Sequence, residues 1–226
     1  MDKRALLGTV ERDTGASPQW SVVWLHGLGA DGNDFVPFVP EVIRPDWPAI
    51  RFVFPHAPVR GVTINNGARM RAWYDIQDFD LANRADEQGV EESIVQVDAL
   101  IAREVERGIP ASRLLLAGFS QGGAITLAAG MRRAEPLAGL IGLSTYLPAA
   151  ARSVAALHAN ASSQPLFMAH GVHDPVVPYA AGERSAELLR GQGFDVQWHR
   201  YPMQHQVCAE EIRDLGDWMS QRFAAG

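Results

Sequence analysis

Residues 113–123, Arg-Leu-Leu-Leu-Ala-Gly-Phe-Ser-Gln-Gly-Gly, decide the fold that this sequence predicts. The apolar run 114–116 has the length and the flanking turn residues of a strand that is buried on both faces. An apolar, helix-like stretch follows directly after the glycines. Between the two lies Gly118-x-Ser120-x-Gly122, and in so sharp a turn the glycines remove the Cβ atoms that would collide. The order strand, turn, helix therefore predicts that Ser120 projects beyond the edge of the sheet.

Ser120 in such a turn is a candidate nucleophile. The following helix directs free N–H groups and its positive dipole end at whatever Ser120 attacks, so the backbone amide of Gln121 is a candidate oxyanion donor. A Gly-x-Ser-x-Gly match can also arise by chance or serve as an ordinary glycine-rich connection. The strand before it and the helix after it favour the catalytic interpretation.

Three further candidate residues also follow predicted strands. They are Leu28 after residues 22–25, Asp174 after residues 166–170, and His205 after residues 196–200. Loops that follow parallel strands gather along one edge of a sheet, so we expect these residues to meet Ser120 there. The sequence around Leu28 is His26-Gly27-Leu28-Gly29; its glycines let the backbone approach a substrate, and we interpret His26 as structural.

The chain order serine, acid, histidine is the order of the α/β-hydrolase arrangement. A serine hydroxyl needs a base, and a neutral imidazole with a pKa of about 6.5 can take its proton and return it to a leaving group. His205 fits that role, and Asp174 would fix the imidazole tautomer. The amides of Leu28 and Gln121 would bind the developing oxyanion.

Other acids and other chemistry compete with this assignment. Asp75, Asp78 and Asp195 are alternative acids, but only Asp174 combines a strand-end loop with the right chain order. His170 and His173 beside Asp174 could be read as metal ligands, although no further ligand cluster accompanies them. The lone cysteine, Cys208, could be read as a thiol nucleophile, but it lacks the strained turn of Ser120. We therefore predict a serine nucleophile and no metal.

Predicted strands and helices alternate along the chain without a repeat or linker, which indicates a mostly parallel central sheet with helices on both faces, in one domain over residues 1–226. The strands are weakly indicated within 5–19, and then at 22–25, 51–54, 114–116, 137–143, 166–170 and 196–200; the helices lie near 35–42, 90–107, 124–129, 180–190 and 212–223. Residues 56–86 have no clear period and are predicted to be a long functional loop. Within it, Trp73 and Tyr74 could line an acyl pocket or simply pin the loop.

Composition excludes several classes of partner. The net charge is −6 with no basic run, so nucleic acid is not expected as a partner. No stretch approaches the roughly 18 apolar residues that span a bilayer, and the first residues lack the apolar segment of a secretory signal. One cysteine allows no intrachain disulfide. We expect a cytoplasmic protein without stable membrane insertion, and the sequence leaves monomer and homodimer open.

Six motifs together resemble the bacterial carboxylesterase and acyl-protein thioesterase family. They are LHGLGADGNDF (25–35), PHAP (55–58), RAWYDI (71–76), GFSQGGA (118–124), HGVHDPVVP (170–178) and YPMQH (201–205). The resemblance spans nearly the whole chain. It departs at Gln204, where relatives often carry a small residue before the histidine.

The resemblance implies an α/β-hydrolase without a separate cap domain, with Ser120, Asp174 and His205 as triad. It also implies an oxyanion hole at Leu28 and Gln121, with Trp73 beside the substrate groove. Tyr74 is a second candidate substrate-binding residue, and no cofactor is expected. The expected reaction is hydrolysis of a small-molecule carboxylic ester. Thioesters, acylated proteins and lysophospholipids are the rival substrates, and a non-catalytic binding protein on the same fold is the contrasting reading.

Overall fold

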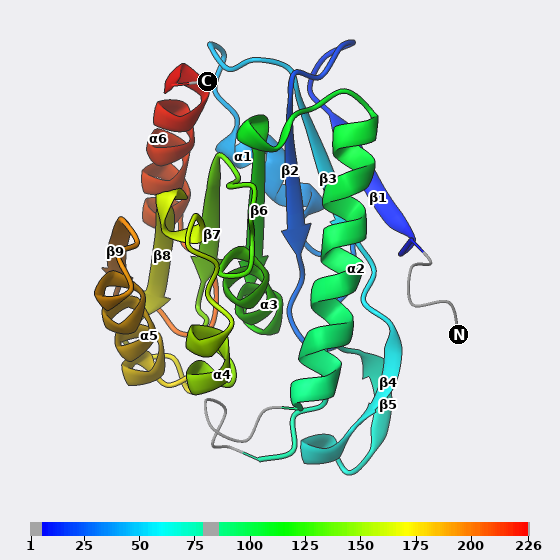
Figure 1. Ribbon diagram of the computed structural model, residues 1–226, viewed down its shortest axis with the longest axis vertical. Helices are drawn as coiled ribbons and strands as arrows, with labels where there is room; N and C mark the ends of the chain where they lie inside the picture. The colour runs from blue at the N-terminus through cyan, green and yellow to red at the C-terminus, as the bar shows by residue number, and fades with distance from the viewer. Residues whose placement is uncertain (1–5, 79–85, 226) are drawn as a thin grey trace.

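The computed structural model describes residues 6–78 and 86–225. Its centre is a seven-stranded sheet in the order β1-β3-β2-β6-β7-β8-β9, shown in Figure 1. All neighbouring strands are parallel except β1, which runs antiparallel to β3 at one edge. The strands of this sheet are β1 (Thr9–Asp13), β2 (Trp20–Leu25), β3 (Ile50–Pro55), β6 (Leu114–Phe119), β7 (Gly139–Leu143), β8 (Leu166–Gly171) and β9 (Val196–Tyr201).

Helices cover both faces of the sheet, as the sequence predicts. Buried side chains of α2, α3 and α5 pack with one face, and those of α1 and α6 pack with the other. The helices are α1 (Val39–Val42), α2 (Glu87–Glu106), α3 (Gln121–Gly130), α4 (Ala150–Ala155), α5 (Tyr179–Gly191) and α6 (Ala209–Ala225). No helix within residues 6–78 and 86–225 is long and apolar enough to cross a membrane.

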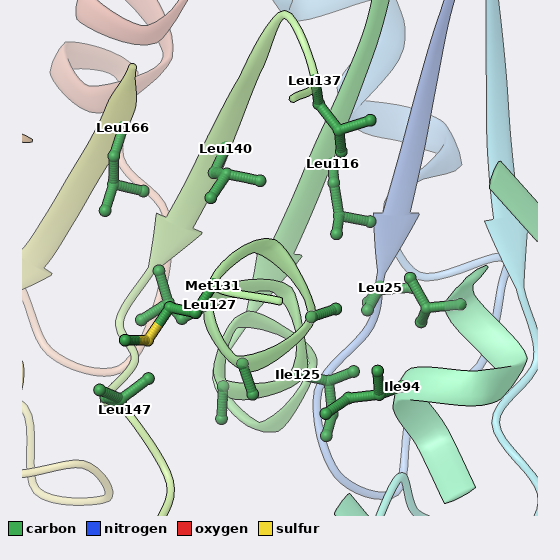
Figure 2. Packing of buried hydrophobic residues seen from close by; sticks show 14 of the residues in the cluster. Leu25, Ile94, Leu116, Ile125, Leu127, Met131, Leu137, Leu140, Leu147 and Leu166 are labelled. Carbon is green, nitrogen blue, oxygen red and sulfur yellow. The ribbon is translucent and has the colours of Figure 1, made fainter. Parts of the chain in front are cut away.

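Strand β6 lies at the middle of the sheet and explains why residues 114–116 are apolar at every position. Leu114 and Leu116 belong to the core on the α3 side, whereas Leu115 belongs to the core on the α6 side. A strand that is covered on both faces has no solvent side to alternate with. Figure 2 shows the α3 side, where Leu116 and Leu140 of the sheet lie beside the leucine and isoleucine side chains of α3.

The structure differs from the sequence prediction in three segments, one of which is α4, a short helix that the sequence did not predict. Residues 56–86 contain a two-stranded antiparallel ribbon, β4 (Val59–Val62) and β5 (Ala68–Arg71), so the prediction of a loop without secondary structure is wrong there. Its strands are largely exposed and carry no clear apolar alternation. Residues 79–85 of that predicted loop lie outside the described chain. The helix predicted near 35–42 is reduced to a 3₁₀ turn, Val36–Phe38, and the short α1, because two prolines fit only the first turn of a helix.

The carboxyl ends of the parallel strands point to one end of the molecule, the lower end in Figure 1. The β4–β5 ribbon lies at the same end. The loops that carry Leu28, Ser120, Asp174 and His205 all follow these strand ends. This arrangement brings four segments that are far apart in sequence to a common edge.

Candidate active site

Ser120 sits in a strained turn between β6 and α3. Its backbone has φ 54° and ψ −121°, a left-handed conformation that is costly for any residue with a Cβ. The turn is fixed from β7, because the Ser120 amide donates to the Leu143 carbonyl (2.9 Å) and the Thr145 hydroxyl donates to the Ser120 carbonyl (2.7 Å). A Cβ at Gly118 would overlap the backbone of Gly122, so the glycines of the motif are required by close backbone packing.

Ser120, His205 and Asp174 form one hydrogen-bonded line. The Ser120 Oγ lies 2.9 Å from the His205 Nε2. The Nδ1 of the same ring lies 2.7 Å from the Asp174 Oδ2. With Nδ1 donating to the carboxylate, Nε2 is free to accept the proton of the serine hydroxyl. The edge of the sheet therefore holds a serine hydroxyl, an imidazole and a carboxylate in direct contact, an arrangement that is able to carry out nucleophilic catalysis.

The carboxylate of Asp174 is fully buried and is held on both oxygens. Oδ1 accepts from the amides of Val176 (2.8 Å) and Val177 (2.9 Å), while Oδ2 accepts from His205 and lies 3.3 Å from the Nε2 of His170. Burial by itself would raise the pKa of Asp174, but the hydrogen bonds from His170, His205 and the two amides outweigh it and hold that pKa well below its usual range. Asp174 is thus an anion at neutral pH.

The loop after β2 carries Leu28 to the side of Ser120. A Cβ placed on Gly27 would lie 3.5 Å from the Ser120 Cβ, so the two loops touch. His26 fixes the Gly27–Leu28 peptide: its Nε2 accepts from the Ala57 amide (3.1 Å), so Nδ1 carries the proton and donates to the Gly27 carbonyl (2.7 Å). The peptide is trans, and the Leu28 N–H therefore points away from His26.

His26 is buried, which lowers its pKa, so the ring stays neutral and keeps this pair of hydrogen bonds. The indole N–H of Trp73 donates to the His26 carbonyl (2.9 Å) and closes the loop from the other side. The prediction that His26 is structural agrees with these contacts.

The Gln121 side chain ties the start of α3 to the segment after β5. Its Oε1 accepts from the Trp73 amide (2.9 Å), and its Nε2 donates to the Tyr74 carbonyl (2.8 Å). The side chain is buried, and both its oxygen and its nitrogen have backbone partners. The backbone N–H of Gln121 lies in the first turn of α3, where it has no intrahelical partner, so it is available to a bound group together with the positive end of the helix dipole.

An apolar cavity of about 370 Å³ opens beside Ser120. Its lining combines the two oxyanion candidates with side chains from the ribbon segment, from the loop after β7 and from the loop after β8: Leu28, Ile64, Asn65, Ile76, Ser120, Gln121, Tyr146, Pro175, Val176 and Val177. The sequence analysis missed the apolar members. Tyr146, Val176 and Val177 could have been found by their position just after strand ends, whereas Ile64 and Ile76 belong to the segment without a period.

Trp73 and Tyr74 do not line this cavity, and the structure corrects their predicted placement. Trp73 is 0% exposed and Tyr74 is 1% exposed. The hydroxyl of Tyr74 lies 2.6 Å from that of Tyr146, which does line the cavity. Burial raises the pKa of both phenols, that of Tyr146 to about 12, so the pair stays protonated. Tyr74 contacts the lining residue Tyr146, and the Trp73 amide donates to the side chain of the lining residue Gln121. The two aromatic residues therefore lie behind the cavity wall and support it.

The residues that the sequence offered as alternative acids, nucleophile or metal ligands lie outside the line of Ser120, His205 and Asp174. Asp75 accepts from the amide (2.7 Å) and hydroxyl (2.6 Å) of Thr63 and so braces the ribbon, while Asp195 is exposed before β9. Cys208 lies before α6 against the apolar core. Within residues 6–78 and 86–225, no group of three or more His, Cys, Asp or Glu side chains could hold a metal ion. His173 is exposed on the loop that carries Asp174.

A parallel sheet covered by helices, with a strained serine after a central strand and the serine–histidine–acid line at its edge, defines a serine hydrolase of the α/β-hydrolase fold. Comparison with known proteins gives the particular family. Residues 11–222 match the family described as Phospholipase/Carboxylesterase, and the chain belongs to that family.

Relatives and solved structures agree with the family. The chain is 37% identical to acyl-protein thioesterase 1 of Cryptococcus neoformans over 218 residues, which cover 89% of this chain and 91% of the relative. It is 33% identical to a probable carboxylesterase of Oryza sativa subsp. japonica, covering 90% and 78%. Among solved structures, Zea mays acyl-protein thioesterase 2 is similar with a TM-score of 0.81 at 28% identity, covering 96% and 99%. These relatives are fungal and plant proteins, not the bacterial members that the sequence motifs suggested.

Proposed function

We propose that Ser120, His205 and Asp174 are the catalytic triad of a carboxylesterase that works through an acyl-enzyme. The observation that carries the proposal is the pair of contacts made by His205, 2.9 Å to the serine hydroxyl and 2.7 Å to the carboxylate. Each ring nitrogen has one partner, so the imidazole is held in the tautomer that can accept a proton from serine.

The reaction has two halves. The Ser120 oxygen attacks the ester carbonyl while His205 takes the hydroxyl proton, and the carbonyl oxygen becomes an oxyanion that the N–H groups of Leu28 and Gln121 bind. The intermediate expels the alcohol, which receives the proton from His205, and leaves an acyl-serine. Water then attacks the acyl-serine, His205 takes a water proton, and collapse of the second oxyanion releases the acid and returns the proton to Ser120. Asp174 stays ionised throughout.

The cavity beside Ser120 is the proposed site of the acyl group. Its side walls are apolar at Ile64, Ile76, Val176 and Val177, and hydrophobic walls of this kind take up hydrocarbon chains by removing them from water. The cavity lies next to the loop that offers the Leu28 N–H. An acyl chain seated there has its carbonyl beside Ser120. We propose esters of acids with an apolar chain as the substrate class.

Thioesters are the second candidate substrates. They are favoured by the similarity to acyl-protein thioesterase 1 of Cryptococcus neoformans, which covers most of both chains. The same triad and oxyanion donors would act on a thioester, since only the leaving group changes from an alcohol to a thiol. An acylated protein or a lysophospholipid would present the same acyl group to the cavity, with a larger leaving group outside it.

The test is hydrolysis of p-nitrophenyl esters with and without a fluorophosphonate, which labels an activated serine. We expect a burst of p-nitrophenol, labelling of Ser120 and loss of turnover after labelling. Ser120→Ala should abolish burst and label and keep the fold, while Ser163→Ala, at an exposed serine far along the chain, should behave as wild type. Paired oxygen and sulfur esters of increasing chain length then rank the two substrate classes. Absence of both burst and label in the wild-type protein contradicts the proposal.

A further inference from the structure

His170, the one histidine of β8, is fully buried directly behind the acid of the proposed triad. Its Nε2 lies 2.9 Å from the Val177 carbonyl and 3.3 Å from the Asp174 Oδ2. Both neighbours are acceptors, one a carbonyl and the other an ionised carboxylate. Nε2 must therefore carry a proton and share it between them, which makes His170 a donor to Asp174.

The two histidines meet on the same carboxylate oxygen. His205 donates to Oδ2 from the substrate side, and His170 reaches Oδ2 from the protein side. The other oxygen accepts the amides of Val176 and Val177. The carboxylate thus has four N–H groups around it, two on each oxygen, and the plane of the carboxylate is fixed. Without His170, Oδ2 would be held by His205 alone.

The position of the His170 ring is itself fixed by α5. A Cβ on Gly182 of α5 would overlap the His170 Nδ1, so only glycine at that position lets the helix approach the ring. The rings of Tyr179 and Trp198 lie about the imidazole at 6.0 and 6.1 Å between centroids. Nδ1 is buried and has no hydrogen-bond partner within residues 6–78 and 86–225. The ring is held by packing at Nδ1 and by hydrogen bonds at Nε2 only.

We infer that His170 is a positioning residue, which donates from Nε2 to Asp174 and to the Val177 carbonyl and so sets the direction in which Asp174 accepts from His205. This inference rests on the proposed triad and deepens it. It also gives a use to the histidine that the sequence left as a rejected metal ligand. His170 does not line the cavity, so it acts through Asp174 and has no contact with the acyl group.

The role predicts effects that simple packing does not. A hydrogen bond to a charged group is worth about ten- to a hundredfold in an equilibrium constant, so loss of the His170 donor should lower kcat by up to about that factor. KM for a short ester should stay unchanged because the cavity is untouched. The charge of Asp174 would then be shared with His205 alone and would hold the protonated imidazole more tightly. The acid limb of the kcat/KM profile should therefore move to higher pH.

The experiment compares three variants with the wild-type protein. His170→Leu removes the donor, and His170→Gln places an amide N–H near the position of Nε2. His173→Leu makes the same change at an exposed histidine three positions along, which does not contact the Asp174 carboxylate among the described contacts. We measure kcat, KM and the pH profile with p-nitrophenyl butyrate, the rate of fluorophosphonate labelling, and thermal unfolding of each protein.

We expect His170→Leu to lower kcat and labelling and to shift the acid limb, His170→Gln to recover most of both, and His173→Leu to match wild type. A folded leucine variant with the wild-type kcat and pH profile overturns the inference. So does a glutamine variant as impaired as the leucine variant, because the ring shape would then matter and the donor would not. Failure of the wild type itself to label at Ser120 is a separate result, and it contradicts the proposed function.

One measurement needs no variant to fold and no turnover. The ¹⁵N spectrum of histidine-labelled wild-type protein should show His170 with a proton on Nε2. A proton on Nδ1 with a bare Nε2 would exclude donation to Asp174 and overturn the inference. This readout decides the role of His170 even if the leucine variant does not fold.

Discussion

The replacement Asp174→Asn tests the proposed site most directly. The carboxylate accepts four N–H groups, two amides on Oδ1 and two imidazoles on Oδ2. An asparagine has one oxygen, so one of these pairs must face its NH₂ group. If the oxygen stays on the amides of Val176 and Val177, which cannot change their protons, the NH₂ group faces the two histidines. His205 must then move its proton from Nδ1 to Nε2 to avoid donor against donor.

That tautomer is the wrong one for catalysis. A protonated Nε2 lies 2.9 Å from the Ser120 Oγ and cannot accept its proton. Loss of the base by this route costs roughly 10⁴-fold in kcat, which corresponds to about 5.4 kcal/mol of transition-state stabilisation. KM for a short ester should change little, because Asp174 does not line the cavity.

The assay is steady-state hydrolysis of p-nitrophenyl butyrate together with the rate of fluorophosphonate labelling. Asp195→Asn serves as the control, because the same chemical change is made at an exposed acid. We expect it to retain wild-type activity. A folded Asp174→Asn protein that keeps more than about a tenth of wild-type kcat would refute the claim that the Asp174 carboxylate sets the catalytic tautomer of His205.

Three further changes test other parts of the molecule. Burial raises the pKa of Glu211 to about 8, above its value of roughly 4.3 in an unfolded chain, so its ionisation opposes folding as the pH rises through that window. Glu211→Gln should match wild type near pH 4 and be more stable at pH 9 by up to roughly 5 kcal/mol in urea unfolding, and equal curves at pH 9 would contradict this. Gly122→Ala drives a Cβ into the backbone at the end of β2 and should cost about 1–3 kcal/mol, whereas Gly191→Ala, whose Cβ would meet open space, should not lower the melting temperature. Ile76→Trp should fill the cavity and raise KM for a dodecanoyl ester about tenfold or more while leaving an acetyl ester unaffected, which a chain-length series measures.

The fold could be predicted from the sequence wherever burial on both sides of an element left a clear pattern. Residues 114–116 and 166–169 are apolar throughout because helices cover both faces of their strands. The ribbon at 59–71 could not be found this way, since it is largely exposed and does not belong to the main sheet. The short α4 has one buried residue and no apolar period to reveal it.

The site could be predicted as far as chain order and strand ends reach. Ser120, Asp174 and His205 meet because each follows a parallel strand, which is a matter of topology. Trp73 could not be placed from its type, because an aromatic side chain near a site can face the cavity or the core, and its indole N–H is bound to a backbone carbonyl. The contact between His170 and Asp174 could not be predicted from the sequence either, because the two side chains meet only when the loop after β8 folds back onto the strand.

Gln121 joins two parts of the molecule that are usually thought of separately. Its backbone N–H is a proposed oxyanion donor, while its amide side chain binds the backbone of Trp73 and Tyr74. Substitutions in the ribbon segment, at residues such as Ile64, can therefore change the shape of the proposed acyl cavity without affecting α3, as long as the main chain at 73–74 does not move. Substitutions that move the main chain at 73–74 would also break the hydrogen bonds that hold the start of α3. Such substitutions should therefore change substrate selectivity and lower the reactivity of Ser120 together.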